Sequence, residues 1–218
     1  MTKQELLTQI SNDIREHTCS LRAGCTQAVP GDGNPDSDIV FIGEGPGKVE
    51  DEVGKPFVGP AGRVLDGLLA GIGLQRSDIY ITNVVKCRPP ANRDPSPSEV
   101  AEHAEFLKRE LELLKPKLIV LLGRHALHWF LPNDQIGQVH GHAKRQGDQV
   151  FFPIYHPAAV LHNPPLMNDL QNDFAKIPAL LKKTVELLPE PGGSQSRRPL
   201  AAAETNTNIA QTNLFEIK

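Results

Sequence analysis

The stretch DIVFIGEGPG, residues 38–47, joins a short apolar run to a glycine-rich turn that carries a carboxylate. Four consecutive apolar residues, Ile39 to Ile42, indicate a buried β-strand, and three glycines follow at alternate positions. Glycine accepts backbone conformations that a Cβ atom resists, so the turn places Glu44 at a strand end. Because ligands bind at the carboxyl ends of strands in open parallel sheets, Glu44 is a candidate for chemistry.

The rest of the chain predicts an α/β domain around this strand. Three further segments have the buried-strand pattern, at residues 79–85, 117–123 and 150–156, and helical patterns lie at 1–17, 59–74, 98–115, 124–131 and 170–188. This alternation predicts a three-layer α/β/α sandwich with a mainly parallel four-stranded central sheet. The segments GEGPG, NVVKCRPPANR and HPAAVL then follow strand ends and converge on one edge of the sheet.

Length and composition favour one domain with a tail. The chain has 218 residues, of which 39% are hydrophobic, so we expect one domain over residues 1–188 and a flexible, apolar-poor tail over 189–218. No apolar window approaches the ~20 residues of a membrane span, and the first helix pattern is amphipathic. We therefore expect a soluble, cytoplasmic, nucleoid-associated monomer.

Charge and cysteine content narrow the options for partners and metals. The net charge of -3 gives no long-range attraction to nucleic acid, so any such contact must be local. Candidate phosphate contacts are Lys86, Arg88 and Arg93 in one loop and Lys144 and Arg145 before the last strand, although each also fits a solvated surface. Three cysteines argue against a disulfide framework and leave metal ligation, reactivity or burial open.

Three long motifs together resemble one known family. The segments GEGPGKVEDEVGKPFVGPAG, TNVVKCRPPANRDP and HPAAVL are similar, in this order, to the motifs of the family 4 (iron-sulfur-type) uracil-DNA glycosylases, and the resemblance covers residues 19–188. It implies an enzyme that flips uracil out of single- or double-stranded DNA and hydrolyses its N-glycosidic bond, which initiates base excision repair. No cofactor is implied in the chemical step.

The resemblance also implies a role for residues that bind the base. Phe57 matches the residue that stacks on the flipped uracil, and Asn83 matches the one whose amide pairs with the uracil edge. An amide offers both a donor and an acceptor, as that edge requires. Gly43 and Gly45, which lie in the same turn as Glu44, are also expected to bind the substrate. The alternatives are a core phenylalanine and a turn asparagine.

Three residues are implied in the chemistry. His156 matches the histidine that stabilises negative charge on the departing base, and the adjacent Pro157 fixes its turn. Glu44 could orient the attacking water and favour a cationic sugar, and Asn92 could help to place the water. Relatives with a GQDPYH-type motif carry an aspartate where this chain has Gly45, so the role of Glu44 stays open.

The metal site is where the sequence departs from the family. The resemblance implies a [4Fe-4S] cluster held by four cysteines, of which Cys19 and Cys87 match two, while Glu16 and His103 occupy the other two positions. Cys25 lies close enough along the chain to substitute for one ligand. A cluster or zinc bound by Cys19, Cys87, Cys25 and His103, or no metal with His103 in the core, are the open alternatives.

The sequence is also compatible with two other functional classes, and it suggests one further partner. A non-catalytic or covalently trapping uracil-DNA-binding protein would have the same fold, but the short KCRPPANRDP loop lacks the basic insertion of such relatives. A nucleotide-binding domain would use GEGPG for phosphate, and the HPA motif argues against it. In the tail, the pentapeptide QTNLF, from Gln211 to Phe215, resembles the peptide that docks bacterial DNA-processing enzymes on the sliding clamp; an ordinary C-terminus is the alternative.

Overall fold

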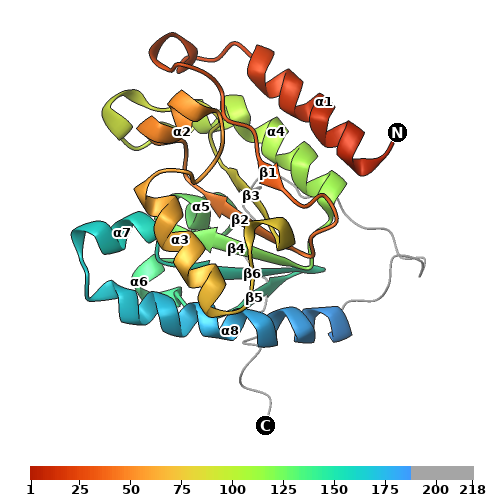
Figure 1. Cartoon of the computed structure of the whole chain (residues 1–218), viewed down its shortest axis with the longest axis vertical. Helices are drawn as coiled ribbons and strands as arrows, with labels where there is room; N and C mark the ends of the chain where they lie inside the picture. The colour runs from red at the N-terminus through yellow and green to blue at the C-terminus, as the bar shows by residue number, and fades with distance from the viewer. Residues whose placement is uncertain (188–218) are drawn as a thin grey trace.

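The computed structural model describes residues 1–187, which form one mixed sheet between two helical layers (Figure 1). The strands are β1 (Asp32–Gly33), β2 (Ile39–Gly43), β3 (Tyr80–Asn83), β4 (Leu118–Leu122), β5 (Lys144–Gln146) and β6 (Gln149–Ile154), in the order β1-β3-β2-β4-β6-β5. β3, β2, β4 and β6 are parallel, as predicted. The sheet has six strands rather than four, because β1 and β5 add short antiparallel edges.

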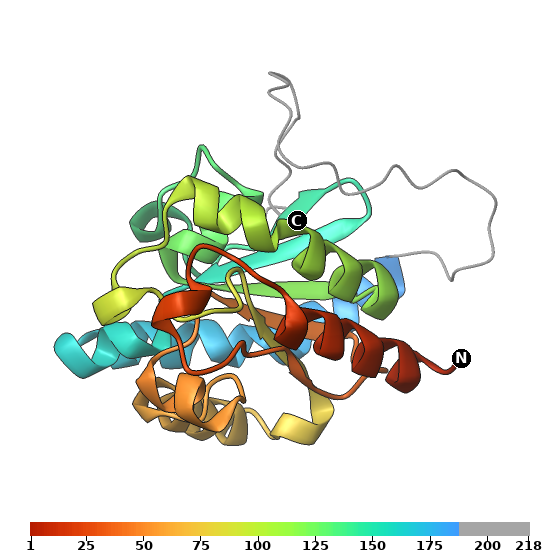
Figure 2. The same ribbon diagram turned by 90° about the horizontal axis from the view of Figure 1, so that it is seen from above.

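Eight α-helices are described, and they cover both faces of the sheet. They are α1 (Lys3–Glu16), α2 (Lys48–Val53), α3 (Pro60–Gly71), α4 (Pro97–Leu114), α5 (Gly123–Phe130), α6 (Ile136–Val139), α7 (Pro157–His162) and α8 (Leu166–Leu187). Side chains of α3, α7 and α8 share one core with the sheet, and those of α1, α4 and α5 share the other. Figure 2 shows α4 and α3 on opposite sides of the strands, so the three-layer α/β/α architecture is confirmed.

The apolar run of the opening motif is buried on both faces. Phe41 points to the core under α3 and α8, where its ring stacks on Phe174 at a centroid distance of 6.0 Å. Val40 and Ile42 point to the opposite core under α4 and α5. Alternate residues of a strand face opposite ways, so a continuous apolar run is what a central parallel strand requires.

The strand order creates a topological switch point at one edge of the sheet. From β2 the chain passes to β3 on one side and later to β4 on the other, so the carboxyl ends of β2 and β4 lie at a topological switch point. The residues that end or follow the parallel strands there are Gly43, Asn83, Gly123 and His156.

One predicted DNA contact is wrong, because Lys86 is buried. Its side chain is 1% exposed, and its Nζ donates to Glu110 Oε2 at 2.7 Å, Thr82 Oγ1 at 2.6 Å and the Asn83 carbonyl at 2.9 Å. A lysine with its donors directed into the protein cannot reach a phosphate. The ion pair instead ties the loop after β3 to α4.

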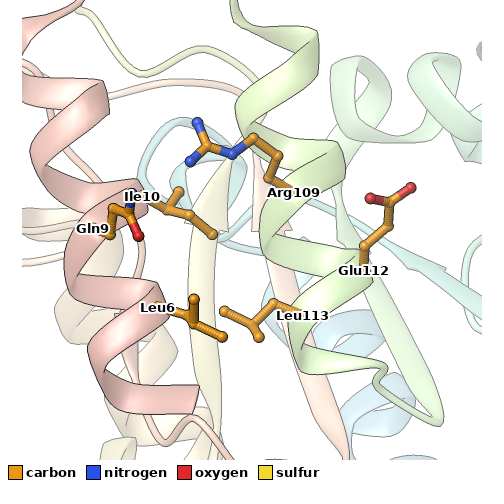
Figure 3. Close-up of a pocket in the computed structure, with 6 residues that line it drawn as sticks. All are labelled: Leu6, Gln9, Ile10, Arg109, Glu112 and Leu113. Atoms are coloured by element: carbon orange, nitrogen blue, oxygen red, sulfur yellow. The ribbon is translucent and has the colours of Figure 1, made fainter. Parts of the chain in front are cut away.

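A hollow of about 310 Å³ lies between α1 and α4 (Figure 3). Its lining consists of Leu6, Gln9, Ile10, Arg109, Glu112 and Leu113, and Arg109 forms an ion pair with Asp13 at 2.5 Å. None of these residues belongs to the strand ends, so the hollow is not the candidate site. Among the described residues, no helix combines the length and the apolar character that crossing a membrane demands.

Candidate active site at the strand ends

Asn83 ends β3 and pairs in register with Gly43 of β2. The residue is 1% exposed, and within the described part of the chain neither its Nδ2 nor its Oδ1 has a hydrogen-bond partner. Leaving a buried polar group unpaired costs about 1–3 kcal/mol. The amide therefore suits a ligand that offers one acceptor and one donor.

Gly43 leaves room for the two side chains beside it. A Cβ atom at this position would lie 2.5 Å from Asn83 Oδ1 and 2.6 Å from Phe57 Cζ, closer than real contacts allow. Gly45 permits a similar approach, since its Cβ would lie 2.6 Å from Val85 Cγ2. Both glycines serve close packing around the turn, which places Asn83 and Phe57 together.

Phe57 lies in a constrained loop between α2 and α3. Its φ of 54° is unusual for a residue with a side chain, and Arg76 donates to its carbonyl and to that of Pro56. The Phe57 ring is buried and stacks on His156, with a centroid distance of 5.6 Å and an angle of 30° between planes. The loop thus brings the predicted stacking residue against the predicted catalytic histidine.

His156 is the N-cap of α7, and this position determines which ring nitrogen carries the hydrogen. Its Nδ1 accepts a hydrogen bond from the backbone N of Ala158 at 3.1 Å, so the neutral ring carries its hydrogen on Nε2. Although part of the residue reaches solvent, desolvation of the ring, with a smaller effect of His125, lowers the pKa of His156 to about 4. At neutral pH the ring is therefore an uncharged donor.

Glu44 follows β2 and lies in a group of charged side chains. Burial, with a smaller effect of Asp94, raises the pKa of Glu44 to about 7, and Arg124 opposes the shift. His125 Nε2 lies 3.6 Å from Glu44 Oε2 and 3.2 Å from Asp94 Oδ1. Glu44, Asp94 and His125 each offer one ligand atom within 4.8 Å of the others, so they could hold a cation as well as a water. This carboxyl group titrates near neutral pH.

His125, Asp94 and Arg124 were missed by the sequence interpretation. Arg124 and His125 belong to a segment whose pattern predicts only a short helix, and Asp94 belongs to a proline-rich loop. The available signal was that Arg124 and His125 follow the buried run LIVLL after a single glycine. Polar residues directly after a parallel strand belong to the ligand-binding edge.

Asn92 is not brought into this group. The residue is exposed, with a φ of 55°, and its Oδ1 accepts from Arg88 Nε at 2.7 Å. Arg93 forms an ion pair with Glu99 at 2.5 Å, and Lys144 pairs with Asp134 at 2.7 Å. Water placement by Asn92 and phosphate contacts by these cations stay predictions.

A second polar group lies where α4 meets the loops after α1 and β3. Cys19, Cys87 and His103 each offer one ligand atom, and these atoms lie within 4.8 Å of one another. His103 is fully buried; its Nδ1 bonds the Glu99 carbonyl at 2.8 Å, and its Nε2 has no partner among the described residues. The Nε2 of His17 is likewise buried and unpartnered. The group can hold a metal.

The donor set does not match the four-cysteine cluster of the family. Each iron of a cubane needs its own outer ligand. Glu16 is exposed at the end of α1, and the Cys25 thiol bonds to Arg22, with its Sγ 3.4 Å from Nη1 and 3.7 Å from the carbonyl oxygen. Cys19, Cys87 and His103 converge on one point, which suits a single ion.

The remaining sequence predictions concern residues outside the described part of the chain. The tail over 189–218 and its pentapeptide from Gln211 to Phe215 both lie there.

The chain is similar to proteins of one known family. The model of the family described as the Uracil DNA glycosylase superfamily matches residues 30–182. The chain is 48% identical to a type-4 uracil-DNA glycosylase of Archaeoglobus fulgidus, with 82% of this chain and 95% of the relative aligned. It is 42% identical to the type-4 enzyme of Saccharolobus solfataricus, over 83% of this chain and 89% of the relative. It is 40% identical to that of Thermotoga maritima, over 84% of this chain and 98% of the relative.

Proposed function

Since the chain belongs to the uracil DNA glycosylase superfamily and within it to the type-4 uracil-DNA glycosylases, we propose that the residues at its strand ends carry out uracil excision. The protein is a DNA N-glycosylase that hydrolyses the N-glycosidic bond of uracil in DNA repair. The observation that carries the assignment of the site is the buried amide of Asn83, which is unpaired among the described residues. This amide and the Phe57 ring both pack against Gly43, and the same ring stacks on the neutral imidazole of His156.

Recognition of the base begins with extrusion of the nucleotide from the DNA. A base inside a duplex cannot be reached, so it is flipped out at a cost of a few kcal/mol. Uracil presents an N3–H donor next to an O4 acceptor, and the Asn83 amide offers the matching acceptor and donor. Phe57 supplies an aromatic face for the base. Pairing with the base gives the amide the hydrogen bonds that it lacks within residues 1–187, which favours the correct base.

Cleavage places negative charge on the uracil and positive charge on the sugar. The His156 Nε2–H donates to a uracil oxygen as the C1′–N1 bond lengthens, and so stabilises the departing anion. The α7 cap holds this donor in place before the reaction, so no reorganisation is needed. Deprotonated Glu44 orients water toward C1′ and stabilises the cationic sugar, with His125 beside it.

Asn83→Ala tests the assignment directly. We expect this variant to release uracil from a single-stranded oligonucleotide with a kcat/KM about a hundredfold below wild type, because a preorganised polar contact is lost. Asn168→Ala, on an exposed position of α8, is the matched control and should retain full activity. Equal rates for Asn83→Ala and wild type would remove Asn83 from the site. Binding without cleavage by the wild type would instead support the non-catalytic alternative.

The pH dependence of the reaction should follow the deprotonation of the Glu44 carboxyl group. Its raised pKa of about 7 means that the required carboxylate forms only as the pH rises, while His156, with a pKa of about 4, is already neutral. We expect kcat/KM to increase about tenfold per pH unit below pH ~7 and to level off above it. Asp94→Asn removes a nearby negative charge and should move the inflection to lower pH. A profile that is flat from pH 5 to pH 9, about two units either side of this pKa, would contradict the role of Glu44.

Phe57→Ala should mainly weaken substrate binding. Stacking of a base on an aromatic ring contributes about 1–3 kcal/mol, so KM should rise while kcat changes less. Steady-state kinetics on a uracil-containing oligonucleotide separate the two parameters. Phe130→Ala, a partly buried position outside the strand ends, controls for loss of a ring elsewhere. A fall in kcat alone would show that Phe57 acts on the reacting bond instead.

Three finer assignments are proposals that rest on sequence alone. The DNA substrate is single- or double-stranded, the protein acts as a cytoplasmic, nucleoid-associated monomer, and the pentapeptide from Gln211 to Phe215 docks on a sliding clamp. Leu214→Ala/Phe215→Ala should abolish retention in a clamp pull-down and leave oligonucleotide cleavage unchanged. The [4Fe-4S] cluster that the family implies is the alternative to the single metal ion proposed below.

A further inference from the structure

We propose that Cys19, Cys87, His103 and His17 bind one tetrahedral divalent ion of the zinc type, in place of an iron-sulfur cluster. The site lies where the loop after α1 and the loop after β3 meet α4. It is independent of the residues assigned to uracil excision. The ion would have a structural role, because it would join three segments that are far apart in the sequence.

The tautomer of His103 is the one that a metal ligand needs. Its Nδ1 lies 2.8 Å from the Glu99 carbonyl, which can only accept a hydrogen bond, so Nδ1 carries the hydrogen. The Nε2 atom therefore presents a lone pair, and it is buried without a partner in residues 1–187. Metal-bound histidines typically donate their other ring nitrogen to a carbonyl or carboxylate in this way.

His17 provides the fourth donor. It caps the C-terminus of α1 two residues before Cys19, and its Nε2 is the second buried imidazole nitrogen without a described partner. Its ring packs edge-on against both His103 and Phe106, at centroid distances of 5.8 Å and 4.9 Å. Two histidine nitrogens and two cysteine thiolates are a known ligand set of zinc.

Distances and charge favour one ion over a cluster. Zinc bonds of about 2.0–2.3 Å place tetrahedral ligand atoms about 3.3–3.8 Å apart, and the donors of Cys19, Cys87 and His103 already lie within 4.8 Å of one another. A cubane spreads its ligands over four irons, so their donor atoms stand farther apart. Two thiolates also cancel the charge of a divalent ion, which leaves a neutral group in a buried site.

Metal analysis of the full-length protein separates the alternatives. We expect anaerobically purified protein, from cells supplied with iron and zinc, to contain about one zinc per chain and no acid-labile sulfide. Co²⁺ exchanged into the site should give the absorption bands of a tetrahedral ion with sulfur ligands. Iron with equimolar sulfide, or protein without metal, would overturn the proposal. Neither measurement depends on uracil release, so failure here leaves the proposed function intact.

Two variants test the choice of the fourth ligand. His17→Gln should weaken zinc binding by more than about a hundredfold, the upper end of the effect of losing an outer-shell partner. Cys25→Ser tests the competing ligand, since the Cys25 thiol also lies near Cys87. This variant should bind zinc as wild type does, because we assign the Cys25 thiol to its contact with Arg22. Competition with a chromophoric chelator gives the affinities, and circular dichroism confirms folding. A larger loss in Cys25→Ser than in His17→Gln would overturn the assignment of His17.

Discussion

His156→Ala should lower kcat for uracil release by about two to three orders of magnitude, the usual effect of removing one preorganised donor to a developing anion. The donor matters in the transition state, where the bond to the base is breaking, so KM should change little. Single-turnover cleavage of a uracil-containing oligonucleotide measures the chemical step alone.

The variant must be separated from a folding defect, because His156 also caps α7. Loss of an N-cap costs about 1 kcal/mol. His156→Asn restores a capping side chain but not the reach of an imidazole, so it should recover the melting temperature and remain inactive. His162→Ala, at the exposed end of α7, should be fully active. Wild-type rates in His156→Ala would exclude this residue from the chemistry.

Lys86→Met should reduce the free energy of unfolding by about 3–5 kcal/mol, because it leaves the buried carboxylate of Glu110 without its counter-charge. Glu110 would retain hydrogen bonds from Tyr80, Thr82 and the backbone of Gly31, which do not replace an ion pair. Urea unfolding monitored by circular dichroism measures the change.

Two further variants test whether the loss of stability comes from the buried ion pair. Lys108→Met removes a lysine whose ion pair with Glu105, at 3.9 Å, is exposed, and should change stability by less than about 0.5 kcal/mol. In Lys86→Met/Glu110→Leu both charges are absent, so much of the lost stability should return. A loss below about 1 kcal/mol in Lys86→Met alone would mean that the pair is not buried in solution.

The fold was predictable where the chain makes long, regular elements. Three of the four parallel strands, β2, β4 and β6, have a continuous apolar run, and α4 has a repeated stripe that includes Leu107, Leu111 and Leu114. β1 and β5 were missed because they are only two and three residues long, too short for a period in the apolar pattern to show. Their pairing depends on neighbouring strands, which a local pattern does not contain.

The site was predictable where a residue ends a strand. Asn83 and His156 are found at the sheet edge, whereas Lys86, three residues beyond Asn83, turns inward to Glu110. Sequence alone did not indicate this partner, which lies on another element. His125 and His17 were missed for the same reason, since their significance depends on Glu44 and His103, distant in the sequence and adjacent in space.

The candidate site takes Gly43, Asn83, Gly123 and His156 from four separate strand ends, so its contacts join residues that are far apart in the chain. Contacts of large sequence separation form late in folding, after the entropy of closing long loops has been overcome. No fragment that lacks a parallel strand can assemble this site, and partly folded chains should be inactive rather than weakly active. Recovery of uracil release during refolding should therefore follow completion of the whole sheet.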